Sequence, residues 1–197
     1  MSKGAETRAA ILPKAMALAS EKGLDGISIG NLAKEVGLSK SGLFAHFESK
    51  ENLQQEVLAA AVERFVSTVV VPALKQPRGL PRIHALFENW MRWSRHPCMP
   101  GGCLFIAAAN ELDDRPGPLR ERLVAYQRDW IDTLATAARI AVAEGQLRPD
   151  LDVEQFAYNF YSIILAYHHF SRLIRDPDAE ERARRSFEGL LAAAKSP

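Results

Sequence analysis

The sequence predicts an all-α protein, in which a small N-terminal three-helix unit is joined by a long helix to a larger helical part. Three observations predict this fold class. Apolar residues recur with the helical period of 3.6 along nearly the whole chain. No convincing run alternates apolar and polar residues as a strand would. Serine or aspartate stands before several of the periodic segments, in the position of a helix N-cap.

The composition is that of an ordinary globular chain. Of the 197 residues, 47% are hydrophobic and 25% are charged, which excludes a disordered or collagen-like protein. No uninterrupted run of about 18 apolar residues occurs, so we expect no membrane span. No apolar core follows the first six residues, so we expect no signal peptide and a cytoplasmic protein. Two cysteines, Cys98 and Cys103, are too few for a disulfide scaffold.

The first part of the chain contains four expected helices, over residues 5–22, 29–36, 40–47 and 50–74. Pro13 lies inside the first helix and is expected to kink it or delay its start. Gly23 and Gly37 provide stop signals for the first and second helices. A serine stands immediately before the second, third and fourth helices as a predicted N-cap: Ser28, Ser39 and Ser49.

The second part begins after residues 75–81, which are rich in proline and glycine and read as a link. Its expected helices lie near residues 81–95, 102–112, 118–144, 152–175 and 178–194. We therefore divide the chain into two predicted domains, residues 1–52 and 53–197. The second is long enough to carry a binding site and an interface of its own.

The second and third helices form a predicted helix-turn-helix, because only Gly37–Ser39 separates them. At 100° per residue, Leu43 and Phe47 fall on one side of the third helix and Ser41 and Ala45 on the opposite side. Small outward residues allow a helix to approach the floor of a DNA groove, where a serine can bond a base edge or phosphate and an alanine can touch a thymine methyl group.

The starts of these helices favour a phosphate backbone. Free N–H groups and the helix dipole attract anions there, and Lys40 and Lys50 each follow a capping serine by one residue. Helix–glycine–helix segments and serine caps are also common in helical proteins that bind no DNA. The near-neutral charge, with seven basic and six acidic side chains in residues 1–55, argues mildly against nucleic acid and predicts modest non-specific binding.

Residues Gly37–Leu53 resemble the signature of TetR-family transcriptional regulators, Gly-Val-Ser-x-x-Thr-Leu-Tyr-x-His-Phe-x-x-Lys-x-x-Leu, and the resemblance continues upstream over Ile27–Ala33. It implies a ligand-responsive regulator, a repressor that a small molecule releases from its operator. Two positions depart from the signature, Gly42 for threonine and Phe44 for tyrosine. The expected DNA-contacting residues are Ser28, Ser39, Lys40, Ser41, Gly42, Phe44, His46 and Lys50, although His46 serves equally well as a packing residue.

The resemblance also implies a homodimer that reads a pseudo-palindromic operator in double-stranded DNA. The helices near 118–144 and 152–175 are expected to form its interface as a four-helix bundle. The sequence is consistent with this expectation, because the helix at 152–175 has apolar residues almost all round and so requires cover on both sides. A partner chain is the natural second cover.

Aromatic side chains in the second part suggest a pocket for a small-molecule effector. Ordinary core packing is the alternative for each of them. The expected ligand-binding residues are Phe87, Trp90, Trp93, Cys103, Phe105, Asn110, Tyr126, Trp130, Tyr161 and His168. Residues Met99–Phe105 are similar to a subset of the family with a Gly-Cys pair. There Cys103 is either a thiol activated at a helix N-terminus, with Cys98 as its partner, or a small packing residue.

No catalytic motif, metal site or cofactor site is predicted. No spacing of cysteine and histidine resembles a zinc site, and no glycine-rich phosphate loop or nucleophile elbow occurs. We therefore expect a protein that is not an enzyme. Two alternatives remain, a small helical enzyme that uses Glu111 or His168 in the aromatic pocket, and a helical binding protein whose DNA contacts have decayed.

Overall fold

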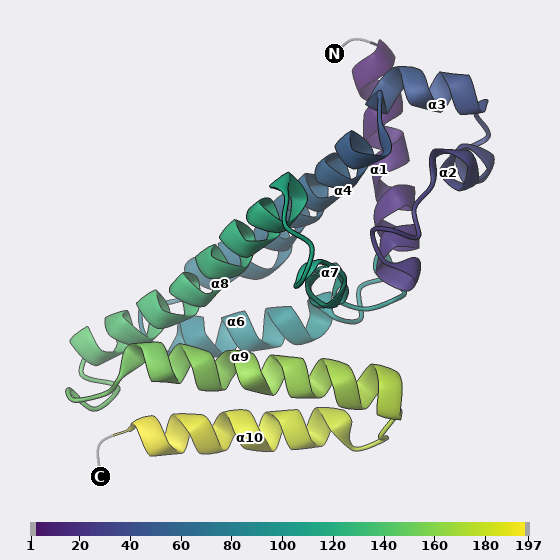
Figure 1. Ribbon diagram of the computed structural model, residues 1–197. Coiled ribbons are helices and arrows are strands. Elements are labelled where there is room, and N and C mark those ends of the chain that lie inside the picture. The colour runs from purple at the N-terminus through teal and green to yellow at the C-terminus, as the bar shows by residue number, and fades with distance from the viewer. Residues whose placement is uncertain (1–2, 196–197) are drawn as a thin grey trace. The chain divides into compact units, whose positions relative to one another are not determined.

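Helices account for all the regular structure of the described chain, residues 3–195 of a computed structural model, and no strand occurs in that range (Figure 1). The all-α fold class is confirmed. In chain order the elements are α1 (Lys3–Lys22), α2 (Ile29–Val36), α3 (Lys40–Phe47), α4 (Lys50–Phe65), the π-helical turn η1 (Val66–Val70), α5 (Val71–Leu74), α6 (Leu80–Trp93), α7 (Leu104–Leu112), α8 (Pro118–Ala143), α9 (Val153–His169), the π-helical turn η2 (Phe170–Ile174) and α10 (Ala179–Ala194).

These helices form two compact units. The first contains the chain up to Val66 together with Trp93–Ala125, and the second contains Ser67–Arg92 together with the chain from Tyr126 onward. The units therefore differ from the predicted domains, since α7 and the start of α8 pack with the N-terminal helices. The division at residue 52 stays a prediction about function.

Helices α1 to α4 bury the apolar faces that their periodicity predicts. Ile11, Ala15 and Ala19 of α1 are buried, as are Leu43 and Phe47 of α3. Arg8 fastens α1 to its neighbours: it donates to the backbone oxygen of His46, pairs with Glu56 at 3.2 Å, and places its guanidinium 5.6 Å from the centre of the Phe47 ring. The three-helix unit thus shares its core with α4.

The expected delay of α1 by Pro13 is wrong, whereas the alternative of a kink stays a prediction. The helix begins at Lys3, ten residues before the proline, and continues to Lys22 without interruption. Pro13 removes one backbone donor, whose partner would be the oxygen of Ala9. Both residues lie on the exposed side of α1, where water can bond the orphaned carbonyl. The cost is therefore small enough for the buried face to hold the helix.

The long fourth helix is interrupted, which the sequence analysis did not predict. The turn η1 widens the helix at Val66–Val70, and α5 follows. Pro72 explains the change, because its ring would clash with the carbonyl of Thr68, four residues earlier, in a regular α-helix. Proline at this position was a signal that could have predicted the break. The boundary between the two units falls at the start of η1.

One stretch, Lys50–Leu74, is long and apolar enough to cross a membrane by length and composition alone. The expectation of no membrane span is based on the absence of an unbroken apolar run, and this finding does not overturn it. The stretch contains five charged residues, but only Glu63 and Arg64 lie in its last 18 positions. Core helices of soluble proteins commonly have the same composition.

The second unit is built on α6, α9 and α10, with the later part of α8. Helices α9 and α10 run side by side in opposite directions (Figure 1), and the backbone N–H of Arg148 donates to the oxygen of Ala194 at 3.0 Å. In the core, the Phe87 and Phe187 rings stack with centroids 4.0 Å apart and planes 2° apart, and Phe160 meets both edge-on.

Candidate nucleic-acid interface and effector residues

The turn between α2 and α3 has the geometry of a helix-turn-helix. Gly37 ends α2 in the left-handed conformation, with φ 70° and ψ 27°. The N–H of Gly37 donates to the carbonyl of Lys34, and the N–H of Leu38 donates to the carbonyl of Ala33. This is the pattern of a glycine C-cap. Glycine is needed here because a side chain would strain the backbone at this φ.

Helix α3 presents the face that the sequence predicts. Leu43 and Phe47 are fully buried, whereas Ser41, Ala45 and Phe44 are exposed. The exposed fraction of Phe44 is 54%, which is high for a phenylalanine and leaves its ring available to a partner.

Each predicted serine cap makes its bond. The hydroxyl oxygens of Ser28, Ser39 and Ser49 accept from the backbone N–H groups of Asn31, Gly42 and Asn52, each at 3.0 Å. Because a serine oxygen that accepts one bond still carries its own hydrogen, the Ser28 and Ser49 hydroxyls retain the capacity to donate to a phosphate oxygen. The Ser39 hydroxyl is also hydrogen-bonded to the Ser41 hydroxyl at 3.1 Å. The caps therefore hold the helices and leave their starts suited to an anion.

A cationic depression lies at the start of α2. It has a volume of about 680 Å³, and among the residues that line it are Ser28, Lys34, Lys40 and Lys50. Three of the predicted DNA residues thus come together, from three different helices. Lys34 was missed, although its place one turn after Gly30 of α2 puts it within reach of the same surface.

An apolar depression adjoins the first and shares Ile29 and Lys40 with it. Its volume is about 470 Å³, and Ser41, Phe44 and Ala45 from the exposed face of α3 complete its lining. The arrangement places apolar contact groups beside cationic groups, which is what a surface needs to touch base edges and phosphates together. Ile29 was also missed by sequence reasoning.

Three predicted DNA residues, Ser28, Gly42 and His46, are only partly exposed, whereas the other five are exposed. A Cβ added at Gly42 would lie 3.1 Å from the Ser39 hydroxyl oxygen, so a side chain would crowd the cap of α3. The His46 ring meets Phe47 edge-on at 6.5 Å, and the His46 backbone oxygen accepts from Arg8. The choice between packing and DNA contact for His46 therefore stays open.

The predicted effector residues are divided between the two units. In the first, Trp93 and Phe105 stack at 6.2 Å and both meet Phe65 edge-on. In the second, Trp90 meets Tyr167 edge-on at 6.1 Å. These ring contacts are compatible with core packing, the alternative given for each aromatic residue, and the effector site stays a prediction.

The remaining predicted effector residues vary in burial. Asn110 is exposed, Tyr126 is half-buried and Trp130 is buried. The Tyr161 hydroxyl bonds Gln127 of α8. His168 is half-buried and its Nε2 has no hydrogen-bond partner, and burial lowers the pKa of its imidazole, with Arg172 adding to the shift. At neutral pH His168 is therefore a neutral group.

Cys103 is buried at the N-cap of α7, and burial raises the pKa of its thiol. Burial disfavours the thiolate more than the nearby N–H groups favour it, and this supports the alternative of a small packing residue over that of an activated thiol.

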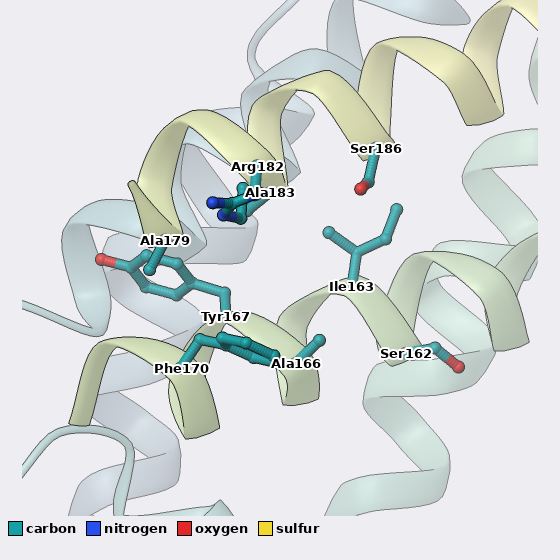
Figure 2. A pocket seen from close by; sticks show the side chains of 9 residues that line it. All are labelled: Ser162, Ile163, Ala166, Tyr167, Phe170, Ala179, Arg182, Ala183 and Ser186. Atoms are coloured by element: carbon teal, nitrogen blue, oxygen red, sulfur yellow. The ribbon is translucent and has the colours of Figure 1, made fainter. Parts of the chain in front are cut away.

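A pocket that the sequence did not predict lies between α9 and α10. Figure 2 shows side chains from the end of α9 and the start of η2 facing those of α10 around a volume of about 360 Å³. Small and apolar groups such as Ala166, Ala183 and Phe170 predominate, with Arg182 as the charged member. None of the predicted effector residues lines it.

Comparison with known proteins assigns the chain to a family. Residues 79–187 match the family model described as tetracyclin repressor-like, C-terminal domain, and residues 11–57 match the model of bacterial regulatory proteins, tetR family. The chain belongs to the TetR family. The two models together cover both the helix-turn-helix and the larger helical part.

Relatives and solved structures agree with this assignment. The HTH-type transcriptional repressor KstR2 of Mycolicibacterium smegmatis is 28% identical over 168 residues, which cover 81% of this chain and 76% of that protein. A TetR transcriptional regulator from Chloroflexus aurantiacus has a TM-score of 0.86 and 27% identity, with 98% of this chain and 96% of that chain covered. AibR, solved with isovaleryl coenzyme A and operator DNA, has a TM-score of 0.72 at 21% identity. The match covers 97% of this chain and 99% of AibR and shows that the two proteins have the same fold.

The predicted class of function is confirmed at the level of the family: this chain is a TetR-family transcriptional regulator with the helix-turn-helix of that family. The relatives are regulators. Nothing in the comparisons favours either alternative, the small helical enzyme or the helical binding protein whose DNA contacts have decayed. Glu111, one of the two residues named for the enzyme alternative, accepts a backbone N–H from Leu24 at 2.7 Å and so has a structural partner.

Proposed function

We propose that this TetR-family protein represses transcription by binding a pseudo-palindromic operator as a homodimer, with α3 of each subunit in a major groove. The cationic depression carries the proposal, because it joins Lys34, Lys40 and Lys50 to the N-terminus of α2 beside the exposed face of α3. The proposed DNA contacts are those lysines, the capping hydroxyls of Ser28 and Ser39, and the face of Ser41, Phe44 and Ala45.

Affinity in this interface depends on the placement of charge and not on its total. The chain has 25 basic and 24 acidic side chains, and its formal net charge is +1. Three lysines that line one depression beside the start of α2 nevertheless create a local positive field, and a dimer doubles it. Phe44 supplies no phenolic hydroxyl for phosphate, so the lysines and backbone N–H groups are proposed to carry the backbone contacts.

We also propose the surface through which the dimer forms. Helix α9 and η2 expose large apolar side chains, with exposed fractions of 68% for Tyr158, 71% for Leu173 and 55% for Ile174. The pocket of Figure 2 continues this surface onto α10. The exposed residues of α8 are mostly charged, among them Arg128, Asp129 and Asp132. Helix α10 is therefore a better companion to α9 in the interface than the segment 118–144 predicted from sequence.

We propose release by a small molecule held within the larger helical part, and no catalytic activity. The test is a footprint of the purified protein on DNA upstream of its own gene, followed by a screen for compounds that abolish the footprint. Protection of a pseudo-palindrome is the expected result. Lys40→Ala should lose protection and Lys75→Ala, which removes a lysine from the end of α5, should keep it. Failure of the wild-type protein to retard this DNA at low salt would overturn the proposal.

A further inference from the structure

The turn between α1 and α2, residues 23–26, is held on one side by α4. Lys50 Nζ donates to the backbone oxygen of Asp25 at 2.8 Å, and Gln54 Nε2 donates to the oxygen of Leu24 at 2.8 Å. Gln54 is buried, so its bond is sheltered from water. Lys50 is exposed and lines the cationic depression, and its ammonium group therefore faces both the turn and the proposed DNA surface.

The same turn is held on its other side by residues that follow in the larger part of the sequence. Glu111, in the last turn of α7, accepts the N–H of Leu24 at 2.7 Å and that of Asp25 at 3.4 Å. Arg115, in the loop after α7, donates to the Asp25 carboxylate. Both residues fall inside the segment that matches the C-terminal family model. This turn thus joins the helix-turn-helix to the other half of the family pattern within one compact unit.

The Asp25 carboxylate lies between two cations. One of its oxygens bonds Arg115, and the other lies 3.6 Å from Lys50 Nζ and 3.3 Å from Gln54 Nε2. The Arg115 hydrogen bond is the largest influence that lowers the pKa of Asp25, and Lys50 adds to it, so the carboxylate is ionised at neutral pH. Lys50 is the more distant of the two cations from the carboxylate, at 3.6 Å, while its ammonium group also donates to the Asp25 backbone oxygen at 2.8 Å.

A lysine that is paired with a carboxylate gains less from a phosphate, because it must give up or share the first partner. While Arg115 satisfies Asp25, much of the charge of Lys50 is available to DNA. Without Arg115, the carboxylate has Lys50 as its remaining cation and draws it away from the phosphate. The strength of one DNA contact therefore depends on a residue that lies outside the helix-turn-helix.

We propose that Asp25 competes with DNA phosphate for Lys50, and that Arg115, as a positioning residue, sets the strength of this competition. The inference rests on the proposed function, since it requires operator binding. A movement that separates the α7–α8 loop from the turn would release the Asp25 carboxylate to Lys50 and weaken the operator complex. An effector that favours the separated arrangement would thereby lower DNA affinity.

The first test measures operator affinity over a range of salt concentrations for single variants. Asp25→Asn should bind the operator about three- to tenfold more tightly than wild type, since in each subunit Lys50 is released from one exposed ion pair. Its affinity should also depend more steeply on salt concentration. Arg115→Gln should bind more weakly by a similar factor, with a shallower dependence. Arg122→Gln is the matched control, because it removes the same charge from the exposed surface of α8 and should change neither quantity.

The second test decides whether Arg115 acts through Asp25. In an Asp25→Asn background, Arg115→Gln should have no further effect on affinity, and the same is expected in a Lys50→Gln background. A loss that persists in either background overturns the proposal, because Arg115 would then touch DNA directly or support the fold alone. Thermal unfolding of every variant identifies misfolding. The Lys50→Gln pair leaves Asp25 intact, so the test does not depend on the Asp25 variant folding.

The two proposals fail in different ways. If the wild-type protein binds no operator, the proposed function is wrong. If wild type binds and Asp25→Asn has unchanged affinity and salt dependence, the DNA-binding function stands and the competition between Asp25 and phosphate is overturned.

Discussion

At the scale of single residues, the chemistry of this protein concentrates on a few charged groups at helix starts. Lys40 and Lys50 each occupy the first residue of a helix, immediately after a serine whose hydroxyl caps it. A helix start already favours an anion, and a lysine there adds a full charge to the partial charge of the N–H groups. A nearly neutral chain can therefore present a phosphate-binding surface.

Replacing Lys50 by alanine tests this role. Lys50→Ala should weaken binding to operator and to unrelated DNA by similar factors, because a phosphate contact carries no sequence information. The slope of log affinity against log salt concentration should fall by about one contact in each subunit. Titrations at several salt concentrations provide the measurement, and an unchanged slope would remove Lys50 from the phosphate contacts.

The ion pair of Asp25 and Arg115 predicts a pH dependence of stability. The Arg115 hydrogen bond lowers the pKa of Asp25, so the folded state favours the ionised carboxylate. Its stabilising contribution is complete above the unfolded pKa, about 3.9, and is lost as the pH falls through the lower folded pKa. The difference in unfolding free energy between wild type and Asp25→Asn should be constant from pH 5 to 7 and should shrink below about pH 4. Urea unfolding at a series of pH values measures it, and a difference that grows in acid would contradict the assigned shift.

At the scale of elements, the ends of helices are determined locally, whereas their interruptions depend on single prolines and their surroundings. Gly37 ends α2 and the serine caps begin α2, α3 and α4, as the sequence predicts. Pro13 leaves α1 intact, but Pro72 follows a π-helical turn. The same residue type has different outcomes because the context decides where the lost hydrogen bond can be satisfied.

Substitutions at two glycines distinguish the cost of backbone strain from the cost of a steric clash. Gly37→Ala meets open space but keeps φ near 70°, and should lower the free energy of unfolding by about 1 kcal/mol. Gly101→Ala should cost more, about 3 kcal/mol, because its Cβ would lie 1.7 Å from the backbone oxygen of Ser20. Urea denaturation of both variants measures the difference, and equal losses would show that the 99–103 loop moves freely away from α1.

At the scale of the whole molecule, the main feature is the apolar surface of α9 and η2, which the single chain leaves uncovered. Leu173, Ile174 and Tyr158 are mostly exposed, and an exposed patch of large side chains marks an interaction surface. In a two-fold dimer the same patch meets itself, so a change at one residue acts twice.

A charge placed on this surface should break the proposed dimer. Leu173→Lys should shift the protein to monomer at micromolar concentration in analytical ultracentrifugation, since it places two like charges at the interface. Operator affinity should fall with it, because one helix-turn-helix reads only a half-site. Asp129→Lys on the charged surface of α8 is the control and should leave the dimer intact. If Asp129→Lys dissociates the protein and Leu173→Lys does not, the interface lies on α8 as the sequence first predicted.

The sequence by itself determined what depends on neighbours along the chain. The all-α class, the caps, the glycine turn and the buried side of α3 follow from periodicity and local backbone chemistry, and all are present in the structure. Only the tertiary structure decided which residues meet. It gathered Ser28, Lys34, Lys40 and Lys50 around one depression, brought aromatic residues of different helices into contact, buried Cys103, and placed Arg115 against Asp25, 90 positions away. Local patterns specify helices because hydrogen bonds within a helix span four residues, whereas a site requires contacts whose sequence separation no periodicity encodes.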